Sequence, residues 1–294
     1  MKVAIYSRVF NKENSKDIQL VFDLLNESEI SYITEELFFA QCIASGLKSK
    51  TSGTFSSQEE IKEFSPDFFI ILGGDGTILD SITFMGNNPV PVLGINKGRL
   101  GFLAGESASD IKNAIGNLLK GHYSIDNRSV LQLDSSNGLF KNANYGLNDF
   151  VIHKKDSSSM ITIHVYTNGE YLNSYWSDGL IISTPTGSTG YSLSCGGPIL
   201  YPGSSSFVIT PIAPHNLNVR PMVISDKNVL SFEIEGRSTS FLISLDSRSE
   251  AIEPNVQLAV KKAPFKFELI RFKEDTYLKT LRRKLMWGLD NRNL

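Results

Sequence analysis

The chain has 294 residues, of which 41% are hydrophobic and 20% are charged, and its formal net charge is -2. These values are typical of a soluble globular protein with one large domain or two domains, and they favour neither nucleic-acid binding nor attraction to an anionic membrane. Cys42 and Cys195 form no CxxC motif and the four histidines are scattered, so we expect neither a disulfide framework nor a zinc site.

Strand-like and helix-like patterns alternate over the first part of the chain, to about residue 125. Met1 leads into a short apolar run that becomes polar too soon for a secretory signal, and no run approaches the roughly 18 apolar residues of a membrane-spanning helix. We therefore expect a cytoplasmic protein without a membrane span. Apolar runs predict strands at 3–6, 68–72 and 92–95, and helical spacing predicts helices at 18–25, 78–85 and 110–119, the last capped by Ser109-Asp110. Continuous apolar strands between helices indicate a mainly parallel sheet covered on both faces.

The pattern changes to alternating apolar and polar residues after about residue 125. Residues 161–165 and 171–176 flank Asn168-Gly169, which predicts a hairpin with a type I′ turn. Residues 230–234 are expected to pair with 241–245, and alternation continues on both sides of Ala263-Pro264. A helix rich in Lys and Arg is predicted at 276–287. The chain therefore reads as an α/β domain followed by an antiparallel β domain.

The stretch ILGGDGTILD at 71–80 places glycines and an aspartate between a predicted strand and a predicted helix. A purely structural turn is one explanation, since glycine adopts positive φ and aspartate or threonine can cap a helix. The spacing fits neither the dinucleotide fingerprint nor a Walker loop. The third explanation is a phosphate-binding turn, in which Asp75 binds Mg²⁺ or accepts a proton from a hydroxyl that attacks phosphorus.

The second motif is DGLIISTPTGSTGYSLSCGGP at 178–198. Within it, five Ser and Thr hydroxyls at 183–189 lie beside four glycines at 187–197. Such a loop suits close approach of the backbone to a polar ligand with several rings. A Ser/Thr-rich surface loop is the alternative. The spacing around Ser188 excludes a GxSxG nucleophile elbow.

GGDGT at 73–77 together with TPTGSTGY at 184–191 resembles the NAD kinase family. GGDGT alone is shared with lipid kinases and phosphofructokinases, whereas the second motif is highly specific. Further similar segments extend over almost the whole chain: GIN at 94–96, GRLGFL at 98–103, LND at 147–149, Pro214-His215, Arg220-Pro221, and LRRKL with Trp287-Gly288 near the end.

The resemblance implies a Rossmann-like α/β domain, a β-sandwich-like domain and a C-terminal helix that returns to the first domain. The implied bounds are 1–125 with 272–294 for the nucleotide-binding domain and 126–271 for the NAD-binding domain. The implied reaction transfers the γ-phosphoryl group of ATP to the 2′-hydroxyl of the adenosine ribose of NAD, with Mg²⁺ or another divalent cation. A homodimer or homotetramer is implied as well.

The resemblance also implies roles for individual residues. Asp75 would be the base near the ribose 2′-hydroxyl, and the amides of Gly74 and Gly76 would approach phosphates. Asn148 would bind the adenine edge and Asp149 the ribose hydroxyls, although the family usually has glutamate there. Other residues would contact the cofactor: Asp178 the nicotinamide amide, and Ser188, Thr189 and Tyr191 the adenine and ribose. Thr186 and Gly190 would also belong to the cofactor-binding site.

The chain departs from the family pattern in a few places. Asp246-Ser247-Arg248 stands where the family has Asp-Gly-Gln, so a fixed charge replaces a neutral amide. Gly190 and Cys195 replace alanines, and we expect Cys195 to be inert. Lys154-Lys155 and the basic residues at 282–284 are predicted to be solvated, whereas His215 and Arg220 are open between structural and ligand-binding roles.

Two other functions stay open from the sequence. A lipid kinase with GGDGT would need an apolar pocket for acyl chains, which the hydroxyl-rich loop does not favour. A non-catalytic NAD-binding sensor is the second alternative, and the presence of Asp75 speaks against it.

Overall fold

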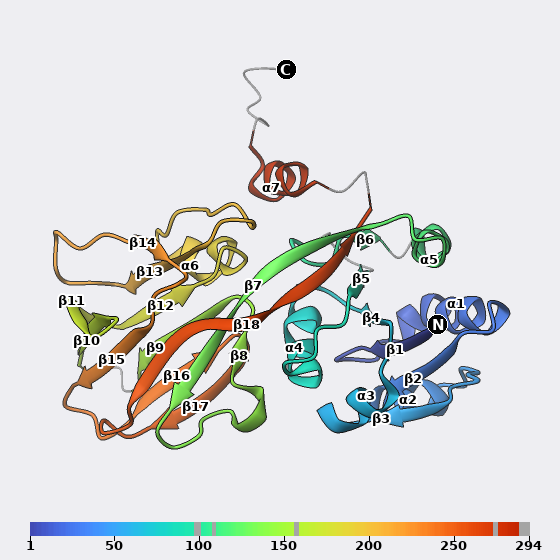
Figure 1. Cartoon of the computed structure of the whole chain (residues 1–294), viewed down its shortest axis with the longest axis horizontal. Helices are drawn as coiled ribbons and strands as arrows, with labels where there is room; N and C mark the ends of the chain where they lie inside the picture. The colour runs from blue at the N-terminus through green and yellow to red at the C-terminus, as the bar shows by residue number, and fades with distance from the viewer. Residues whose placement is uncertain (97–100, 108–109, 156–158, 273–275, 288–294) are drawn as a thin grey trace. The chain divides into compact units, whose positions relative to one another are not determined.

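The computed structural model describes residues 1–96, 101–107, 110–155, 159–272 and 276–287. The chain divides into two compact units (Figure 1). Unit 1 comprises Met1–Asp126 and Glu268–Leu294, and unit 2 comprises Asn127–Phe267. Gly98, Arg99, Leu100 and Gly288, which belong to the motifs above, and the proposed cap Ser109 lie outside the described residues.

Unit 1 is built on a parallel sheet with the strand order β3-β2-β1-β4-β5. The sheet is buried on both faces, which explains the continuous apolar runs of its strands. The short strand β6 and the end of β18 also pair with β5 in parallel. The strands are β1 (Lys2–Tyr6), β2 (Ser31–Glu35), β3 (Gly53–Phe55), β4 (Phe68–Leu72), β5 (Val92–Asn96), β6 (Glu106–Ser107) and β18 (Leu258–Arg271).

Helices cover both faces of this sheet, with α1 and α5 on one face and α3 and α4 on the other (Figure 1). In α1 the buried residues are Ile18, Val21, Phe22 and Leu25, the stripe that the sequence predicts. Asp110 precedes α5 as its N-cap residue, but its carboxylate makes no capping hydrogen bond and accepts one from the Asn113 side chain. The helices are α1 (Ser15–Glu27), α2 (Glu36–Ala44), α3 (Gln58–Phe64), α4 (Asp75–Met85), α5 (Ile111–Leu119) and α7 (Tyr277–Leu285).

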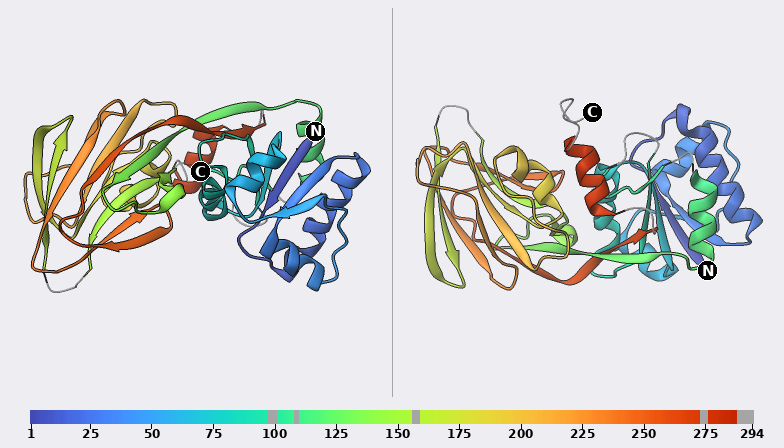
Figure 2. Two further views of the ribbon diagram at one scale, coloured as in Figure 1. Left: turned by 60° about the horizontal axis from the view of Figure 1, so that its bottom comes forward. Right: turned by 90° about the horizontal axis from the view of Figure 1, so that it is seen from above.

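Unit 2 consists of two layers of antiparallel strands (Figure 2). One layer contains β7 (Ser124–Ser135), β8 (Tyr145–Gly146), β10 (Ile161–Thr167), β11 (Glu170–Ser177), β15 (Leu230–Glu235) and β18. The other has the order β14-β13-β12-β9-β16-β17, with β14 (Met222–Ser225), β13 (Ser206–Ile212), β12 (Gly179–Ser183), β9 (Asp149–Lys154), β16 (Phe241–Leu245) and β17 (Arg248–Ile252). The inward side chains of both layers form one core, which makes this unit a β-sandwich.

The hairpin predicted around Asn168-Gly169 is confirmed. Both residues have positive φ, 52° and 86°, as a type I′ turn requires. The predicted pairing of 230–234 with 241–245 is wrong, because β15 pairs with β10 and β18, whereas β16 pairs with β9 and β17. The two strands contribute to the same core from opposite layers, and their alternation is the same in either arrangement.

The predicted fold class is confirmed: an α/β unit with a parallel-rich sheet, an antiparallel β unit and a C-terminal helix. The helix α7 belongs to unit 1, and its Tyr277 ring packs against Phe102 at 6.4 Å between ring centroids. Within the described part of the chain, no helix has the length and apolar character to cross a membrane.

Candidate functional site

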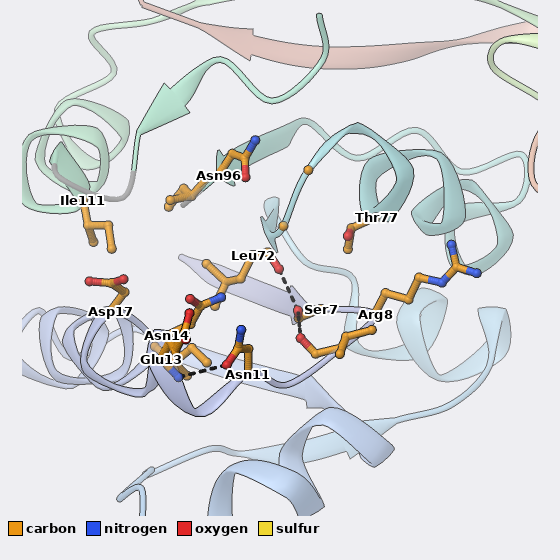
Figure 3. A pocket seen from close by; sticks show the side chains of 15 residues that line it. Ser7, Arg8, Asn11, Glu13, Asn14, Asp17, Leu72, Thr77, Asn96 and Ile111 are labelled. Atoms are coloured by element: carbon orange, nitrogen blue, oxygen red, sulfur yellow. Dashed lines mark hydrogen bonds between the residues drawn. The ribbon is translucent and has the colours of Figure 1, made fainter. Parts of the chain in front are cut away.

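A cavity of about 570 Å³ lies in unit 1 (Figure 3). It forms at the carboxyl ends of three neighbouring parallel strands, β1, β4 and β5. Its opposite wall is the start of α1 and the 3-10 turn Lys12–Asn14. The winding of the sheet reverses between β1 and β4, and ligands of open parallel sheets bind at this switch point. The lining combines apolar side chains with polar ones, and the polar ones include Ser7, Arg8, Asn11, Asn14, Thr77 and Asn96.

The glycine-rich turn joins β4 to α4 in the wall of this cavity. The Gly73 amide donates to the Ile95 carbonyl at 2.9 Å, and a Cβ on Gly73 would lie 2.3 Å from Thr77 Oγ1. Gly74 precedes α4 in an extended conformation, and no side chain caps the helix. The first amides of α4 can therefore bind an anion. Gly76 is exposed, and a Cβ there would meet no atom within 4 Å.

Asp75 is the first residue of α4, and its carboxylate faces the loop after β5. It accepts hydrogen bonds from the amides of Phe102 at 2.7 Å, Leu103 at 3.1 Å and Ala104 at 3.0 Å. A Cβ on Gly101 would lie 1.7 Å from Asp75 Oδ1, so the loop approaches this carboxylate closely. Asp75 thus joins the GGDGT motif to the GFL motif instead of capping its own helix.

Arg8 is a cation in the cavity wall that the sequence analysis missed. Its Nε lies 3.2 Å from Asp80 Oδ2, and the side chain extends toward α4 (Figure 3). No motif surrounds Arg8 in the sequence. Only the fold, which places the end of β1 beside the GGDGT turn, gives it a functional context.

In unit 2 the LND motif at 147–149 and the TPTGSTGY motif at 184–191 meet at the ends of two adjacent strands, β9 and β12. β9 begins at Asp149 and β12 ends at Ser183, and these two residues are paired in register. The Thr184 amide donates to the Asn148 carbonyl at 2.9 Å. A Cβ on Gly187 would lie 2.2 Å from that carbonyl oxygen. The structure therefore brings together two segments that are more than 30 residues apart in sequence.

Asp149 has a buried carboxylate, 7% exposed, next to Asn148. Within the described residues, no group donates a hydrogen bond to this carboxylate, and the Asn148 amide side chain has no hydrogen-bond partner either. Burial, and secondly the neighbouring Asp246 carboxylate, raise the pKa of Asp149 to about 7. Buried polar groups normally have partners in the protein, so this pair is suited to bind the hydroxyl and amine groups of a ligand.

Most hydroxyls of the second motif bind the protein's own backbone. Ser188 Oγ is fully buried, donates to the Pro185 carbonyl at 2.7 Å and accepts from the Leu200 amide at 2.9 Å. Thr189 Oγ1 donates to the Thr186 carbonyl at 3.2 Å. These hydroxyls therefore hold the shape of the loop, a role that its sequence does not predict.

Arg128 in β7 is a buried cation that the sequence did not predict as part of the site. It is 1% exposed, and its Nη1 donates to Thr186 Oγ1 at 3.3 Å.

Gly190 lies further along the loop. A Cβ on Gly190 would lie 3.2 Å from the Gly187 carbonyl oxygen, so an alanine at 190 would require a small adjustment.

Two further predicted site residues, Asp178 and Tyr191, contact side chains of β9. Lys154 Nζ is 2.5 Å from Asp178 Oδ1, and Lys154 is only 22% exposed, so the prediction that Lys154 is a solvated residue is wrong. The His153 ring stacks on Tyr191 at 5.7 Å. Burial lowers the pKa of His153, and the Asp178 charge partly offsets this.

His215 and Arg220 belong to the exposed loop between β13 and β14, which lines a second cavity of about 600 Å³ with β11. The His215 ring contacts Trp176 at 5.3 Å. Arg220 donates to the carbonyls of Leu217 at 2.8 Å and Val219 at 2.7 Å. Both side chains therefore contribute to the conformation of this loop.

Gly74, Asp75 and Gly76 belong to unit 1, and the other predicted site residues belong to unit 2. In the part of the chain that the structure describes, no three His, Cys, Asp or Glu residues gather so as to hold a metal ion. Burial raises the pKa of the Cys195 thiol, which agrees with an inert cysteine.

Comparisons with known proteins identify relatives over the whole chain. The family model described as ATP-NAD kinase N-terminal domain matches residues 8–123, and the ATP-NAD kinase C-terminal domain model matches 147–272. The NAD kinase of Cytophaga hutchinsonii is 47% identical and that of Flavobacterium psychrophilum 46% identical, each over 100% of both chains.

Two solved structures have the same fold. Yeast NADH kinase complexed with NADH has a TM-score of 0.88 and 22% identity, and the match covers 99% of this chain and 88% of that chain. The NAD kinase from Archaeoglobus fulgidus in complex with ATP has a TM-score of 0.74 and 22% identity, with 97% and 99% covered.

Proposed function

This chain belongs to the ATP-NAD kinase family and is an enzyme of the kinase class, and we propose that it phosphorylates NAD with ATP to give NADP. The acceptor in this reaction is the 2′-hydroxyl of the adenosine ribose. The matches to both family domains confirm the resemblance seen in the sequence. They do not favour the lipid-kinase and sensor alternatives.

One observation carries the assignment of the acceptor site: the buried Asp149 carboxylate without a partner in the described chain, beside Asn148. A carboxylate accepts hydrogen bonds from a ribose diol, and an amide can both donate to and accept from the edge of adenine. We assign these two contacts to Asp149 and Asn148. A shorter aspartate still suits the role, because β9 begins at this residue and a hydrogen bond from its own amide fixes its backbone.

The other residues of this site have supporting roles. Asp178 would bind the nicotinamide amide, and Tyr191 would cover the adenine or ribose. Thr186, Ser188, Thr189 and Gly190 would shape the loop that binds the dinucleotide. The three hydroxyls make hydrogen bonds within the protein, and Gly190 lies close to the backbone of Gly187. Residues 126–271 would thus form the NAD-binding domain.

ATP would bind through the glycine-rich turn of the domain formed by 1–125 with 272–294. The uncapped start of α4 offers amides to phosphates, including those of Gly74 and Gly76, and Arg8 supplies a positive charge nearby. Mg²⁺ prefers oxygen ligands and commonly binds through substrate phosphates. The carboxylates and amide oxygens around the cavity fit such an ion, which would neutralise phosphate charge.

Asp75 would accept the proton of the ribose 2′-hydroxyl as this oxygen attacks the γ-phosphorus. Three amides hold its carboxylate in one orientation, which is the positioning that phosphoryl transfer requires. As the phosphoryl group transfers, the bond from the 2′-oxygen to phosphorus forms and the bond from phosphorus to the β–γ bridging oxygen breaks, releasing ADP.

The test is a direct assay: purified protein with ATP, Mg²⁺ and NAD, with NADP measured by a NADP-specific dehydrogenase. We expect NADP and ADP in equal amounts. Phosphate transfer to a lipid, or NAD binding without turnover, would refute the proposal. By the family resemblance we also propose a cytoplasmic homodimer or homotetramer, whose mass light scattering after gel filtration measures.

A further inference from the structure

The turn between β16 and β17 contains the departure from the family pattern, Asp246-Ser247-Arg248. Asp246 has a φ of 53°, in the left-handed region, whereas Ser247 has a negative φ. Aspartate tolerates the left-handed conformation better than most residues, and serine is unstrained at a negative φ. The turn therefore forms without the glycine that the family has at 247.

The half-buried carboxylate of Asp246 binds the segment that contains Asn148 and Asp149. It accepts hydrogen bonds from the amides of Leu147 at 2.8 Å, Asn148 at 2.7 Å and Asp149 at 3.1 Å. In return the Asp246 amide donates to the Asp149 carbonyl at 3.0 Å. Four hydrogen bonds thus fix the backbone from which both side chains of the proposed acceptor site extend.

Arg248 binds the same segment a few residues earlier. Its guanidinium donates from Nη1 to the Ala143 carbonyl and from Nη2 to the Tyr145 carbonyl. It also lies over the Phe140 ring, at 5.5 Å from the centroid. A guanidinium has a planar set of donors that reaches two carbonyls and a ring at once, whereas a glutamine side chain is shorter and uncharged.

The segment needs such contacts because its own backbone is strained. Phe140 and Lys141 follow each other with φ of 55° and 46°, a conformation that costs free energy in residues other than glycine. On the far side, Glu250 of β17 accepts a hydrogen bond from the Phe140 amide at 2.9 Å. Residues of one hairpin therefore hold the segment at both ends.

We propose that Asp246 and Arg248 are positioning residues that hold residues 143–149 so that Asn148 and Asp149 face NAD. The inference rests on the proposed function. It assigns to Arg248, which replaces the family's glutamine, a role in the affinity for NAD. A role in folding alone is the competing explanation, and the two predict different kinetic changes.

The experiment compares Arg248→Gln with Arg237→Gln, which removes the same charge from an exposed arginine of the neighbouring β15–β16 loop. We expect Arg248→Gln to raise the KM for NAD roughly tenfold, since small misplacement of binding groups has effects of this size or larger. The KM for ATP should stay within about twofold, and Arg248→Lys should lie between Gln and the wild type because it keeps the charge but not the fork. Arg237→Gln should change neither constant.

A role in folding alone would lower the melting temperature and the amount of active enzyme, and so reduce kcat while both KM values stay unchanged. That result, or an equal rise of both KM values, would overturn the proposal. If Arg248→Gln does not fold, Arg248→Lys is judged by the same criteria. If the wild type makes no NADP, the proposed reaction fails, and calorimetric titration with NAD still tests positioning: equal affinity of wild type and variant would overturn it.

Discussion

Asp149 and Asp246 are joined by a reciprocal pair of backbone contacts in unit 2. The Asp149 amide donates to Asp246 Oδ1 at 3.1 Å, and the Asp246 amide donates to the Asp149 carbonyl at 3.0 Å. This arrangement places the buried carboxylate of Asp149 next to the half-buried carboxylate of Asp246. Asp246 has three amide donors, whereas Asp149 has none in the described chain. Burial raises the pKa of both carboxyls, and that of Asp149 rises to about 7.

The first prediction concerns stability. The pKa of Asp149 is raised from 3.8 to about 7, so its contribution to stability is fully present below about pH 4 and is lost as the pH rises through 7. Above this range an ionised Asp149 costs about 4 kcal/mol. Asp149→Asn should therefore raise the melting temperature at about pH 8.5 and have little effect at about pH 4. Equal shifts at both pH values would contradict this.

The second prediction concerns NAD binding. If the ionised carboxylate accepts the ribose hydroxyls, its protonation removes the stronger acceptor. The KM for NAD should rise as the pH falls below about 7, and the KM for ATP should not follow it. Steady-state kinetics between about pH 5.5 and 8.5 measure both constants. In Asp149→Asn the pH dependence of the KM for NAD should disappear, at a uniformly weak affinity.

The third prediction is that Asp75→Asn lowers kcat by about 10²-fold or more, because an amide cannot accept the proton of the 2′-hydroxyl. The substitution also has a structural cost. Asparagine has one acceptor oxygen, whereas both oxygens of Asp75 accept amides, so at least one of three hydrogen bonds is lost, at about 1–3 kcal/mol.

Rates for Asp75→Asn are therefore compared well below its melting temperature, with the folded fraction confirmed by circular dichroism. Both KM values should be close to those of the wild type. A kcat within tenfold of the wild type would assign Asp75 to holding the loop at 101–104 only.

Much of the fold could be predicted because the strands of unit 1 are buried on both faces and its helices have one apolar stripe. Strand partners could not be predicted. β15 and β16 follow each other and alternate alike, yet they lie in different layers, and only the three-dimensional structure distinguishes this from a hairpin. Between residues 28 and 66 no element was predicted, because the strands and helices there are short and leave little periodicity.

The site residues that belong to sequence motifs could be predicted. Single charged residues outside a motif could not, because nothing in the neighbouring sequence indicates their contacts. Arg128, Lys154 and Arg248 each look like surface residues in the sequence, but each is buried or paired in the structure. Asp246 binds amides 97 to 99 residues away, a separation at which no local pattern can report contact.

The fourth prediction tests the close packing of the two motifs in unit 2. A Cβ at Gly187 would lie 2.2 Å from the Asn148 carbonyl oxygen, a backbone atom that cannot turn away. Gly187→Ala should therefore displace Asn148 and raise the KM for NAD at least tenfold. Gly116→Ala, in α5 with no atom within 4 Å, is the control and should stabilise the protein by about 0.5–1 kcal/mol. An unchanged KM for NAD in Gly187→Ala would contradict the assignment of Asn148 to NAD binding.

The last prediction concerns the ion pair between Lys154 and Asp178, whose charges are 2.5 Å apart. If Asp178 binds the nicotinamide amide, this pair is electrically neutral beside a ring that is cationic in NAD and uncharged in NADH. Removing the ammonium leaves a net negative charge. At about 7 Å and an effective dielectric constant near 20, this attracts the cationic ring by about 2 kcal/mol before screening.

Lys154→Met should therefore increase the affinity ratio of NAD over NADH by roughly tenfold, whatever it does to either affinity alone. Lys154→Arg keeps the charge and should keep the ratio. Lys155→Met, at the exposed neighbouring position, is the matched control. Calorimetric titration with each dinucleotide measures the ratio directly. An unchanged ratio in Lys154→Met would mean that the nicotinamide ring binds away from Asp178, because a charge change next to the ring must affect a cation and a neutral ring differently.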